Sequence, residues 1–313
     1  MQGLELAREY YRLYGAPMLR ERFPELLPVV AAGLCGAGSE CFGYDDAVSR
    51  DHDLEPGFCI LLPGEEVVDR RTAFLLERAY AALPGEFAGL KRGGLAPVGG
   101  ARRGVLRTAE FFAEKTGTPD GRLCTEDWLH TPEQSLAEAV NGEIFYDGLG
   151  EVTAIRARLS YMPEDVRLKK LAGALLLMAQ AGQYNYSRCL AHGETGAAQL
   201  AVMEFAKNAI HAAFLLNRRY MPYYKWSLRA MRALPRLAAE ADTLEFLIST
   251  DNRAENAEEK AYAIEDVAAR YIAALQEQQL TEAVCAELEK HAYSVQDHIR
   301  DATLRTRHIL WAV

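Results

Sequence analysis

Residues 29–63 read V-V-A-A-G-L-C-G-A-G-S-E-C-F-G-Y-D-D-A-V-S-R-D-H-D-L-E-P-G-F-C-I-L-L-P. Two apolar runs enclose a glycine-rich turn that ends in Gly38-Ser39, followed by an Asp-x-Asp triplet at Asp51 and Asp53. Because successive side chains on a β-strand point to opposite faces, the two aspartates are expected to project together. This stretch therefore predicts two strands with a polar site between them.

We predict the first strand over residues 29–34 and a second that begins at Asp51 and continues through 58–62. Two carboxylates on one face repel each other unless a cation lies between them. Mg²⁺ or Mn²⁺ suits such a pair, because these ions bind a few carboxylates and complete their shells with water and phosphate oxygens. The alternative is a loop of solvated acids, since Asp45 and Asp46 are also present.

The glycines before Ser39 allow a tight turn that brings backbone N–H groups near a helix start, where phosphate binds favourably. With the Asp-x-Asp that follows, this turn resembles the signature of the polymerase-β-type nucleotidyltransferase superfamily. The resemblance implies that Asp51 and Asp53 are catalytic and hold the metal. It also implies that Gly38 and Ser39 bind the β- and γ-phosphates of a nucleoside triphosphate, which Arg50 helps to neutralise.

One feature departs from that superfamily. A third carboxylate is expected on the next strand, and the register of the bacterial antibiotic nucleotidyltransferases puts it near Leu106, which cannot bind a metal. Glu110 and Glu143 are the candidates for this third acid or for a general base. Two-metal phosphoryl transfer normally uses such an acid to complete the site and activate the attacking hydroxyl.

The segment from Ala88 to Ala109 is basic and glycine-rich, and it contains no acid. Its cationic residues are Lys91, Arg92, Arg102, Arg103 and Arg107. The segment either faces the metal site and holds a triphosphate or an anionic substrate, or it is a surface hairpin. We predict a strand over 105–108 and a helix over 109–115.

A second resemblance covers nearly the whole chain. It rests on the R-D-H-D sequence at 50–53, the G-E-I-F-Y-D-G sequence at 142–148 and the M-P-Y-Y-K-W sequence at 221–226. These stretches are similar to a bacterial family of nucleotidyltransferase-like proteins, the DUF4037 group. That resemblance implies a catalytic domain with a helical C-terminal domain and leaves the substrate open.

Composition limits the classes of function. The chain has 313 residues, half of them hydrophobic, and a net charge of −9, which argues against a general nucleic-acid binder. We find no apolar run long enough to span a membrane and no signal peptide, so a cytoplasmic protein is expected. Six cysteines without C-x-x-C spacing indicate buried thiols and neither a zinc site nor a disulfide framework.

We predict an α+β protein with two domains. Residues 1–150 form a nucleotidyltransferase-like domain with a mixed sheet and helices, and residues 151–313 form a helical bundle that binds substrate or a partner. In the first domain a helix is expected over 65–83, with an inner side that comprises Val67, Val68, Phe74, Leu75, Ala79 and Leu83. Apolar spacing predicts helices in the second domain over 164–180, 196–220, 225–240, 254–279 and 281–299.

The predicted break between two of these helices combines aromatic and basic residues. Arg218, Tyr223 and Lys225 offer cations for phosphate and a face for stacking, so they are candidates for the wall of a substrate cleft. The alternative is structural, because Pro222 ends one helix and Trp226 anchors the next. A second polar and aromatic break, at residues 183–188, is a weaker candidate.

The sequence thus predicts a Mg²⁺-dependent (or Mn²⁺-dependent) enzyme that transfers a nucleoside monophosphate from a nucleoside triphosphate to a hydroxyl. A small-molecule acceptor fits the acidic chain best, and a protein side chain is another possibility. The alternative from a different class is a catalytically impaired nucleotide sensor or interaction protein on the same fold, which Leu106 favours. A third reading is a helical scaffold with a vestigial pocket.

Overall fold

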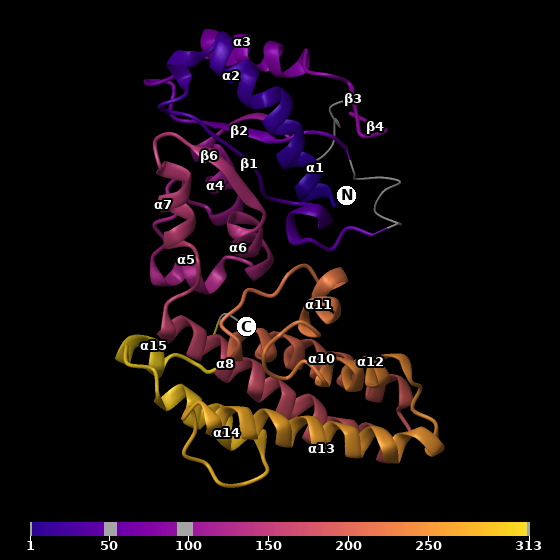
Figure 1. The fold of residues 1–313 in the computed structure, drawn as a ribbon. Coiled ribbons are helices and arrows are strands. Elements are labelled where there is room, and N and C mark those ends of the chain that lie inside the picture. Colours follow the sequence, from indigo (N-terminus) through magenta and orange to yellow (C-terminus); the bar gives the residue numbers. More distant parts are fainter. Residues whose placement is uncertain (1, 47–54, 93–102, 312–313) are drawn as a thin grey trace. The chain divides into compact units, whose positions relative to one another are not determined.

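The computed structural model describes residues 2–46, 55–92 and 103–311. The chain divides into two compact units, the first formed by Met1–Asp127 and Ser135–Ser160 and the second by Trp128–Gln134 and Tyr161–Val313. The described part of the first unit contains strands and helices, and that of the second is helical (Figure 1). The protein is therefore a mixed α+β protein dominated by helices.

A four-stranded mixed sheet with strand order β5-β2-β1-β6 lies in the first unit. β1 (Ala31–Leu34) pairs antiparallel with β2 (Cys59–Leu62) and with β6 (Glu143–Asp147), and β2 pairs parallel with β5 (Gly104–Arg107). With these directions, the place where β1 ends is also the place where the other three strands begin. We call this place the Leu34 end of the sheet.

Two of the predicted strands are confirmed, since β1 and β5 lie within two residues of the expected bounds. The strand expected to run from Asp51 is shorter, because β2 begins only at Cys59 and residues 55–58 are not in a strand. Pro56, which has no backbone N–H to donate to a ladder, accounts for the late start. Asp51 and Asp53 themselves lie outside the described residues.

Helices lie around this sheet (Figure 1). They are α1 (Gly3–Tyr10), α2 (Ala16–Arg22), α3 (Arg70–Ala81), α4 (Thr108–Thr116) and α7 (Glu151–Arg158). Two more helices, α5 (Thr125–His130) and α6 (Glu133–Val140), each contain residues of both units. Short elements complete the unit, namely η1 (Tyr11–Gly15), η2 (Pro24–Leu26), η3 (Ser39–Phe42), β3 (Glu86–Phe87) and β4 (Leu90–Lys91). Tyr10, Leu19, Phe58, Ile60 and Leu76 are among the buried residues of the main core.

The buried face of α3 differs from the predicted one. Phe74 and Leu75 were expected to face inward, but their exposed fractions are 57% and 48%. The helix begins after Asp69, whose carboxylate caps it by accepting a hydrogen bond from the Thr72 N–H at 2.7 Å. The inner face is then set by Tyr80, whose hydroxyl donates to the carbonyl oxygen of Phe58 at 2.7 Å.

The second unit is a bundle built around α8, which packs against α10 and α14. Its helical elements are α8 (Glu164–Met178), η5 (Ala179–Tyr186), α9 (Ser187–Ala191), α10 (Thr195–Leu216), α11 (Tyr224–Met231), α12 (Glu240–Ser249), α13 (Ala254–Glu277), α14 (Leu288–Asp297) and α15 (Ala302–Thr306). Nearly every residue of α8 is buried, including Arg167 and Lys169.

Two of the predicted helices in this unit have the wrong bounds. The helix expected over 225–240 ends at Met231, and a separate helix, α12, follows it. Pro235 and the positive φ of 62° at Leu237 interrupt the chain between them. The helix expected over 281–299 begins only at Leu288. The spacing of hydrophobic residues alone does not reveal where a helix is interrupted in this way.

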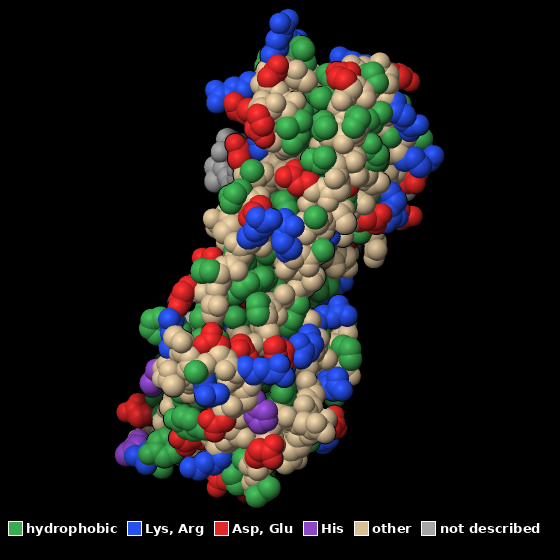
Figure 2. Space-filling view, turned by 90° about the vertical axis from the view of Figure 1, so that its left-hand side faces the viewer, with side chains coloured by type: hydrophobic (Ala, Val, Ile, Leu, Met, Phe, Trp, Pro, Cys, Tyr) green, Lys and Arg blue, Asp and Glu red, His purple; other side chains and the backbone are tan. Residues whose placement is uncertain are grey.

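In the described part of the chain, no helix is both long enough and apolar enough to cross a membrane. Acidic and basic side chains are interspersed over the face shown in Figure 2.

Candidate functional site

The Gly-Ser turn follows β1 directly, at the Leu34 end of the sheet. Gly38 has φ 127° and ψ 143°, a conformation that is almost restricted to glycine. Asn141 holds the turn, because its side-chain amide donates to the Gly36 carbonyl oxygen and its amide oxygen accepts from the Gly36 N–H, both at 2.8 Å. Ser39 is buried and opens η3, a 3₁₀ helix of only four residues. This short helix agrees with the helix start that is expected after the glycines of the turn.

A buried ion-pair network lies beside this turn. Arg103, the residue before β5, contacts Glu40 through Nη2 at 3.0 Å and Glu55 through Nη1 at 2.9 Å. The exposed side-chain fractions are 8% for Arg103, 3% for Glu40 and 34% for Glu55. We call these three residues the Arg103 network. Its members come from three separate segments that meet at the Leu34 end of the sheet.

Asp51 and Asp53, the predicted metal ligands, and Arg50, a predicted phosphate-binding residue, lie outside the described residues. Among the residues that the structure describes, no group of three His, Cys, Asp or Glu side chains is arranged to hold a metal ion. Glu40 and Glu55 are carboxylates near the Gly-Ser turn, but Arg103 already pairs with both. A metal site in this region therefore depends on the two aspartates.

The three positions considered for a third acid lie far apart in the sheet. Leu106 pairs with Leu61 in the middle of β5 and β2. Glu110 follows the other end of β5, in the first turn of α4, so it is remote from the Leu34 end. Glu143 pairs with Leu34 across the strands, but its carboxylate forms an ion pair with Arg8.

The described arginines of the basic segment have structural partners. Arg92 donates to the carbonyl oxygen of Tyr80 at 3.1 Å and stacks over its ring, and Arg107 donates to the carbonyl oxygens of Pro63 at 2.7 Å and Val68 at 2.8 Å. Residues 93–102, with Arg102, lie outside the described part. Arg92 and Arg107 are thus tied to backbone carbonyl oxygens, and the role of the segment in binding a triphosphate or an anionic substrate stays a prediction.

Three of the cysteines are buried near the Leu34 end of the sheet. Cys35, Cys41 and Cys59 are buried there, and burial raises the pKa of each thiol. Such thiols stay protonated and behave as small apolar groups. The prediction of buried thiols is confirmed for these three; Cys124 is exposed, and two others are partly exposed.

The candidate cleft residues of the second unit lie at the break between α10 and α11. Arg218 has a positive φ of 51° and pairs with Glu164 at 2.6 Å. Tyr223 is exposed, with its ring centroid 4.3 Å from that of Tyr224, and Lys225 lies over the Trp226 ring at 5.0 Å. Arg218 and Lys225 therefore already have partners within the helical unit.

A buried polar cluster in the same unit escaped the sequence analysis. The carboxylate of Glu133 contacts His211 Nε2 at 2.6 Å and accepts a hydrogen bond from the Met221 N–H at 3.1 Å. Burial favours a higher pKa for Glu133, but His211, Lys170 and the Met221 N–H outweigh it and hold the pKa below its ordinary value. Glu133 stands alone as an acid after Pro132 in the sequence, and a single glutamate gives no signal of burial.

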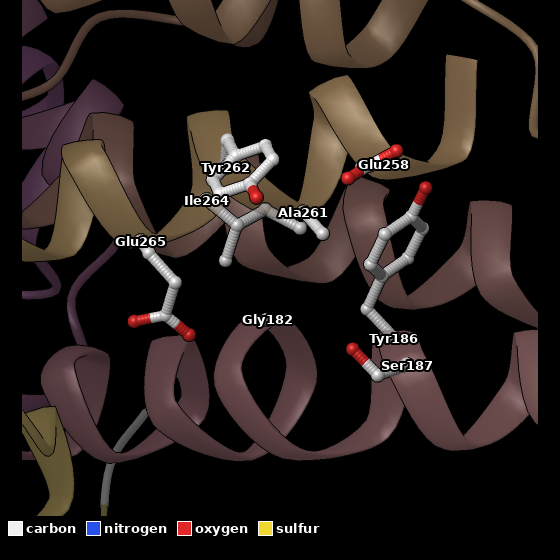
Figure 3. Close-up of a pocket in the computed structure, with 8 residues that line it drawn as sticks. All are labelled: Gly182, Tyr186, Ser187, Glu258, Ala261, Tyr262, Ile264 and Glu265. Atoms are coloured by element: carbon white, nitrogen blue, oxygen red, sulfur yellow. The ribbon is translucent and has the colours of Figure 1, made fainter. Parts of the chain in front are cut away.

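A cavity of about 320 Å³ lies between η5 and α13 (Figure 3). Tyr186 and Gly182 line it from η5, and Glu258, Tyr262 and Glu265 line it from α13. Tyr186 belongs to the second polar and aromatic break of the sequence analysis, and its hydroxyl donates to Asn252 Oδ1 at 3.1 Å. The side chain therefore joins η5 to the segment before α13 in addition to lining the cavity.

One family model matches part of the chain. No curated protein matches the chain with significant similarity. Residues 128–227, which include Glu133, Lys170 and His211, match the model of a family described as a domain of unknown function, DUF4037. This match supports the DUF4037 assignment made from the sequence and identifies residues 128–227 as similar to that family.

Proposed function

We propose that the protein is a Mg²⁺-dependent or Mn²⁺-dependent nucleotidyltransferase that moves a nucleoside monophosphate from a nucleoside triphosphate to a hydroxyl acceptor. The observation that carries the proposal is the Arg103 network. Glu40 directly follows Ser39 of the Gly-Ser turn, Glu55 comes two residues after Asp53, and both carboxylates contact one guanidinium. Asp51 and Asp53 precede Glu55 by four and two residues in the sequence, and they lie outside the described residues.

In this proposal Asp51 and Asp53 hold the metal ion, which supplies positive charge to the phosphate oxygens. Gly38 and Ser39 bind the β- and γ-phosphates, and Arg50 neutralises part of their charge. The acceptor hydroxyl would lose its proton to solvent and its oxygen would bond to the α-phosphorus. The bond from that phosphorus to the bridging oxygen would break, and pyrophosphate would leave. Positioning and charge stabilisation then account for the rate. The helical unit selects the acceptor, for which we favour a small molecule over a protein side chain.

A nucleotide sensor without transferase activity is the second candidate. Two features favour it. The resemblance to the superfamily implies an acid at the position of Leu106, and the start of β5 has the guanidinium of Arg103 beside it. A site with two aspartates and no third acid binds a metal–nucleotide complex but lacks the group that activates the attacking hydroxyl.

Calorimetry with ATP, GTP, CTP and UTP in the presence of Mg²⁺ separates these functions when it is combined with a pyrophosphate assay. The transferase predicts binding of at least one nucleotide and release of pyrophosphate when a pool of small metabolites is added. Binding without pyrophosphate release supports the sensor. Absence of binding, or equal binding by the doubly substituted Asp51→Asn, Asp53→Asn variant, contradicts both.

A further inference from the structure

A cavity of about 530 Å³ lies between the N-terminal helical stretch and strand β6, within the first unit. Arg8, Arg12 and Arg20 line it from α1, η1 and α2. Their spacing by multiples of four residues places them on one side of the helical stretch. The volume is in the range of about 300–1,000 Å³ that is usual for small-molecule sites.

Aromatic rings form a second part of the lining. The rings of Tyr11 and Phe145 are stacked, with their centroids 5.6 Å apart and their planes inclined by 28°. Tyr146 also lines the cavity, and its hydroxyl donates to the carbonyl oxygen of Leu27 at 2.7 Å. Such rings offer flat apolar faces on which the ring of a ligand can stack.

The three arginines differ in their partners. Arg8 forms an ion pair with Glu143. Arg12 pairs with Glu9 at 2.7 Å. Arg20 is exposed, and its Nε donates to a backbone carbonyl oxygen of its own helix at 3.2 Å; no carboxylate of the described ranges pairs with it. A guanidinium has five N–H donors and binds a carboxylate or a phosphate through two parallel hydrogen bonds, so Arg20 has donors to offer to an anion.

The hydroxyl of Tyr11 is a second donor at this place. Only 9% of Tyr11 is exposed, and no hydrogen bond joins its hydroxyl to another residue in the described part of the chain. Burial raises the pKa of Tyr11, the nearby Tyr146 adds to the rise, and the positive charge of Arg20 counteracts part of it. The Tyr11 hydroxyl therefore lies close enough to Arg20 to feel its charge. A buried hydroxyl without a partner is costly, and an acceptor atom of a ligand removes that cost.

We propose that this cavity binds a small organic anion that carries an aromatic ring. The acid group, a carboxylate or a phosphate, accepts hydrogen bonds from Arg20 and from the Tyr11 hydroxyl, and the ring packs against Phe145. The inference does not depend on the proposed nucleotidyltransferase function, because it uses neither the two aspartates nor the Gly-Ser turn.

Isothermal titration calorimetry of the full-length protein with two pairs of probes tests this inference. Indole-3-acetate is compared with indole, and AMP is compared with adenosine, so that the members of each pair differ mainly in the acid group. EDTA is present to exclude metal-dependent nucleotide binding. We expect at least one anion to bind and its neutral counterpart to bind about 10- to 100-fold more weakly, because hydrogen bonds to a charged group are lost. The anion that binds more tightly shows whether the site prefers a carboxylate or a phosphate.

Two substitutions locate the binding. Arg20→Met is expected to lower the affinity for that anion about 10- to 100-fold, and the exposed position of Arg20 makes a loss of folding unlikely to interfere. Tyr11→Phe keeps the stacked ring and removes the hydroxyl, so we expect a loss of about 2- to 10-fold. Arg22→Met is the matched control, because Arg22 is an exposed arginine of the same helix that does not line the cavity. It should bind the anion as the wild type does.

Several results would overturn the inference. The cavity is not an anion site if neither anion binds, if a neutral counterpart binds as tightly as its anion, or if Arg20→Met and Arg22→Met lose the same affinity. Inorganic phosphate or acetate that binds as tightly as the ring-bearing anion would remove the role of the ring. The Asp51→Asn, Asp53→Asn variant should bind the anion unchanged, and a loss in this variant would assign the anion to the proposed nucleotide site instead. Failure of the metal–nucleotide experiment described above would leave this site unaffected.

Discussion

At the scale of single residues, buried charges are the main unexpected feature. Arg103, Glu133, Lys170 and Lys260 are almost completely enclosed, yet each lies among polar partners or an opposite charge. Lys260 donates to Thr250 O, Asn252 Oδ1 and Gln199 Oε1 at 2.8 to 2.9 Å, which satisfies all three ammonium hydrogens. The sequence alone predicts that such residues lie on the surface, because charged side chains are usually exposed.

We expect Glu133→Gln to destabilise the protein by about 2 kcal/mol near pH 7, the contribution of hydrogen bonds to a charged group. The folded-state pKa of Glu133 is lowered, so its stabilisation is complete above the ordinary glutamate pKa of about 4.3 and is lost as the pH falls through the lower folded value. The stability gap between wild type and variant should therefore shrink below about pH 4.

Chemical denaturation at a series of pH values measures this gap. Glu138→Gln is the control, because Glu138 lies one turn further along α6 and is a partly exposed partner of Lys115. A gap that stays constant down to acid pH would contradict the role of the Glu133 charge.

Gly38→Ala should damage the Gly-Ser turn. A Cβ at Gly38 would lie 2.5 Å from a carboxylate oxygen of Glu40, and the φ of 127° is strained for any other residue. We expect a cost of about 1–3 kcal/mol and, in the proposed function, a loss of nucleotide affinity. Gly43→Asn is the control, since that position is left-handed but open, and asparagine tolerates it. Equal nucleotide affinity in both variants would contradict the role of the turn.

At the scale of elements, helix phase and helix type depend on contacts that are distant in sequence. α3 turns Phe74 and Leu75 outward because Asp69 sets its start and Tyr80 binds the backbone of Phe58. η5 is an eight-residue π-helix, a form that mostly appears as a single turn and often near functional sites. It brings Gly182 against Phe205 and Ile264 at the edge of the cavity in Figure 3.

Gly182→Ala should disrupt this contact. A Cβ there would lie 2.4 Å from Phe205 Cδ2 and 2.9 Å from Ile264 Cγ2, so we expect destabilisation of about 1–3 kcal/mol from overpacking. Gly196→Ala, in the first turn of α10, meets no atom within 4 Å and should be neutral or stabilise by about 0.5 kcal/mol. Thermal melts of both variants measure the difference, and equal melting temperatures would show that η5 can shift to admit the methyl group.

At the scale of the whole molecule, the second unit is assembled from two separate parts of the chain. Trp128 and Leu129 are buried, and Glu133 contacts His211 and Met221, although residues 135–160 between these parts belong to the first unit. The helical unit is therefore not a simple C-terminal domain that starts at one residue.

A fragment of residues 161–313 should consequently be less stable than the same unit in the full chain. It lacks the buried apolar side chains of Trp128 and Leu129. It also lacks Glu133, whose negative charge partly counteracts the lowering of the Lys170 pKa by burial. We expect the fragment to melt at a lower temperature than full-length Glu133→Ala, which loses the Glu133 carboxylate and keeps Trp128 and Leu129. If the fragment melts at the same temperature as the wild-type chain, residues 128–134 do not contribute to the stability of the helical unit.

Local pattern by itself determined the α+β class, the positions of β1 and β5, and most helices of the second unit. Apolar residues spaced for strands or helices and glycine-rich turns are properties of residues that are close in sequence. They can therefore be recognised without knowledge of the tertiary structure. The Gly-Ser turn was recognisable for the same reason, because glycines at its corner reflect a backbone conformation that other residues avoid.

Only the tertiary structure decided which charges are buried and what they contact. Arg103 joins Glu40 and Glu55 because three segments converge at the Leu34 end of the sheet, and Glu133 meets His211 across 78 residues of sequence. It also revealed that Arg92 and Arg107 are tied to backbone carbonyl oxygens and that Glu110 lies away from the Leu34 end. Pairings of this kind depend on strand direction and helix phase, which are set by long-range packing and leave no periodic trace in the sequence.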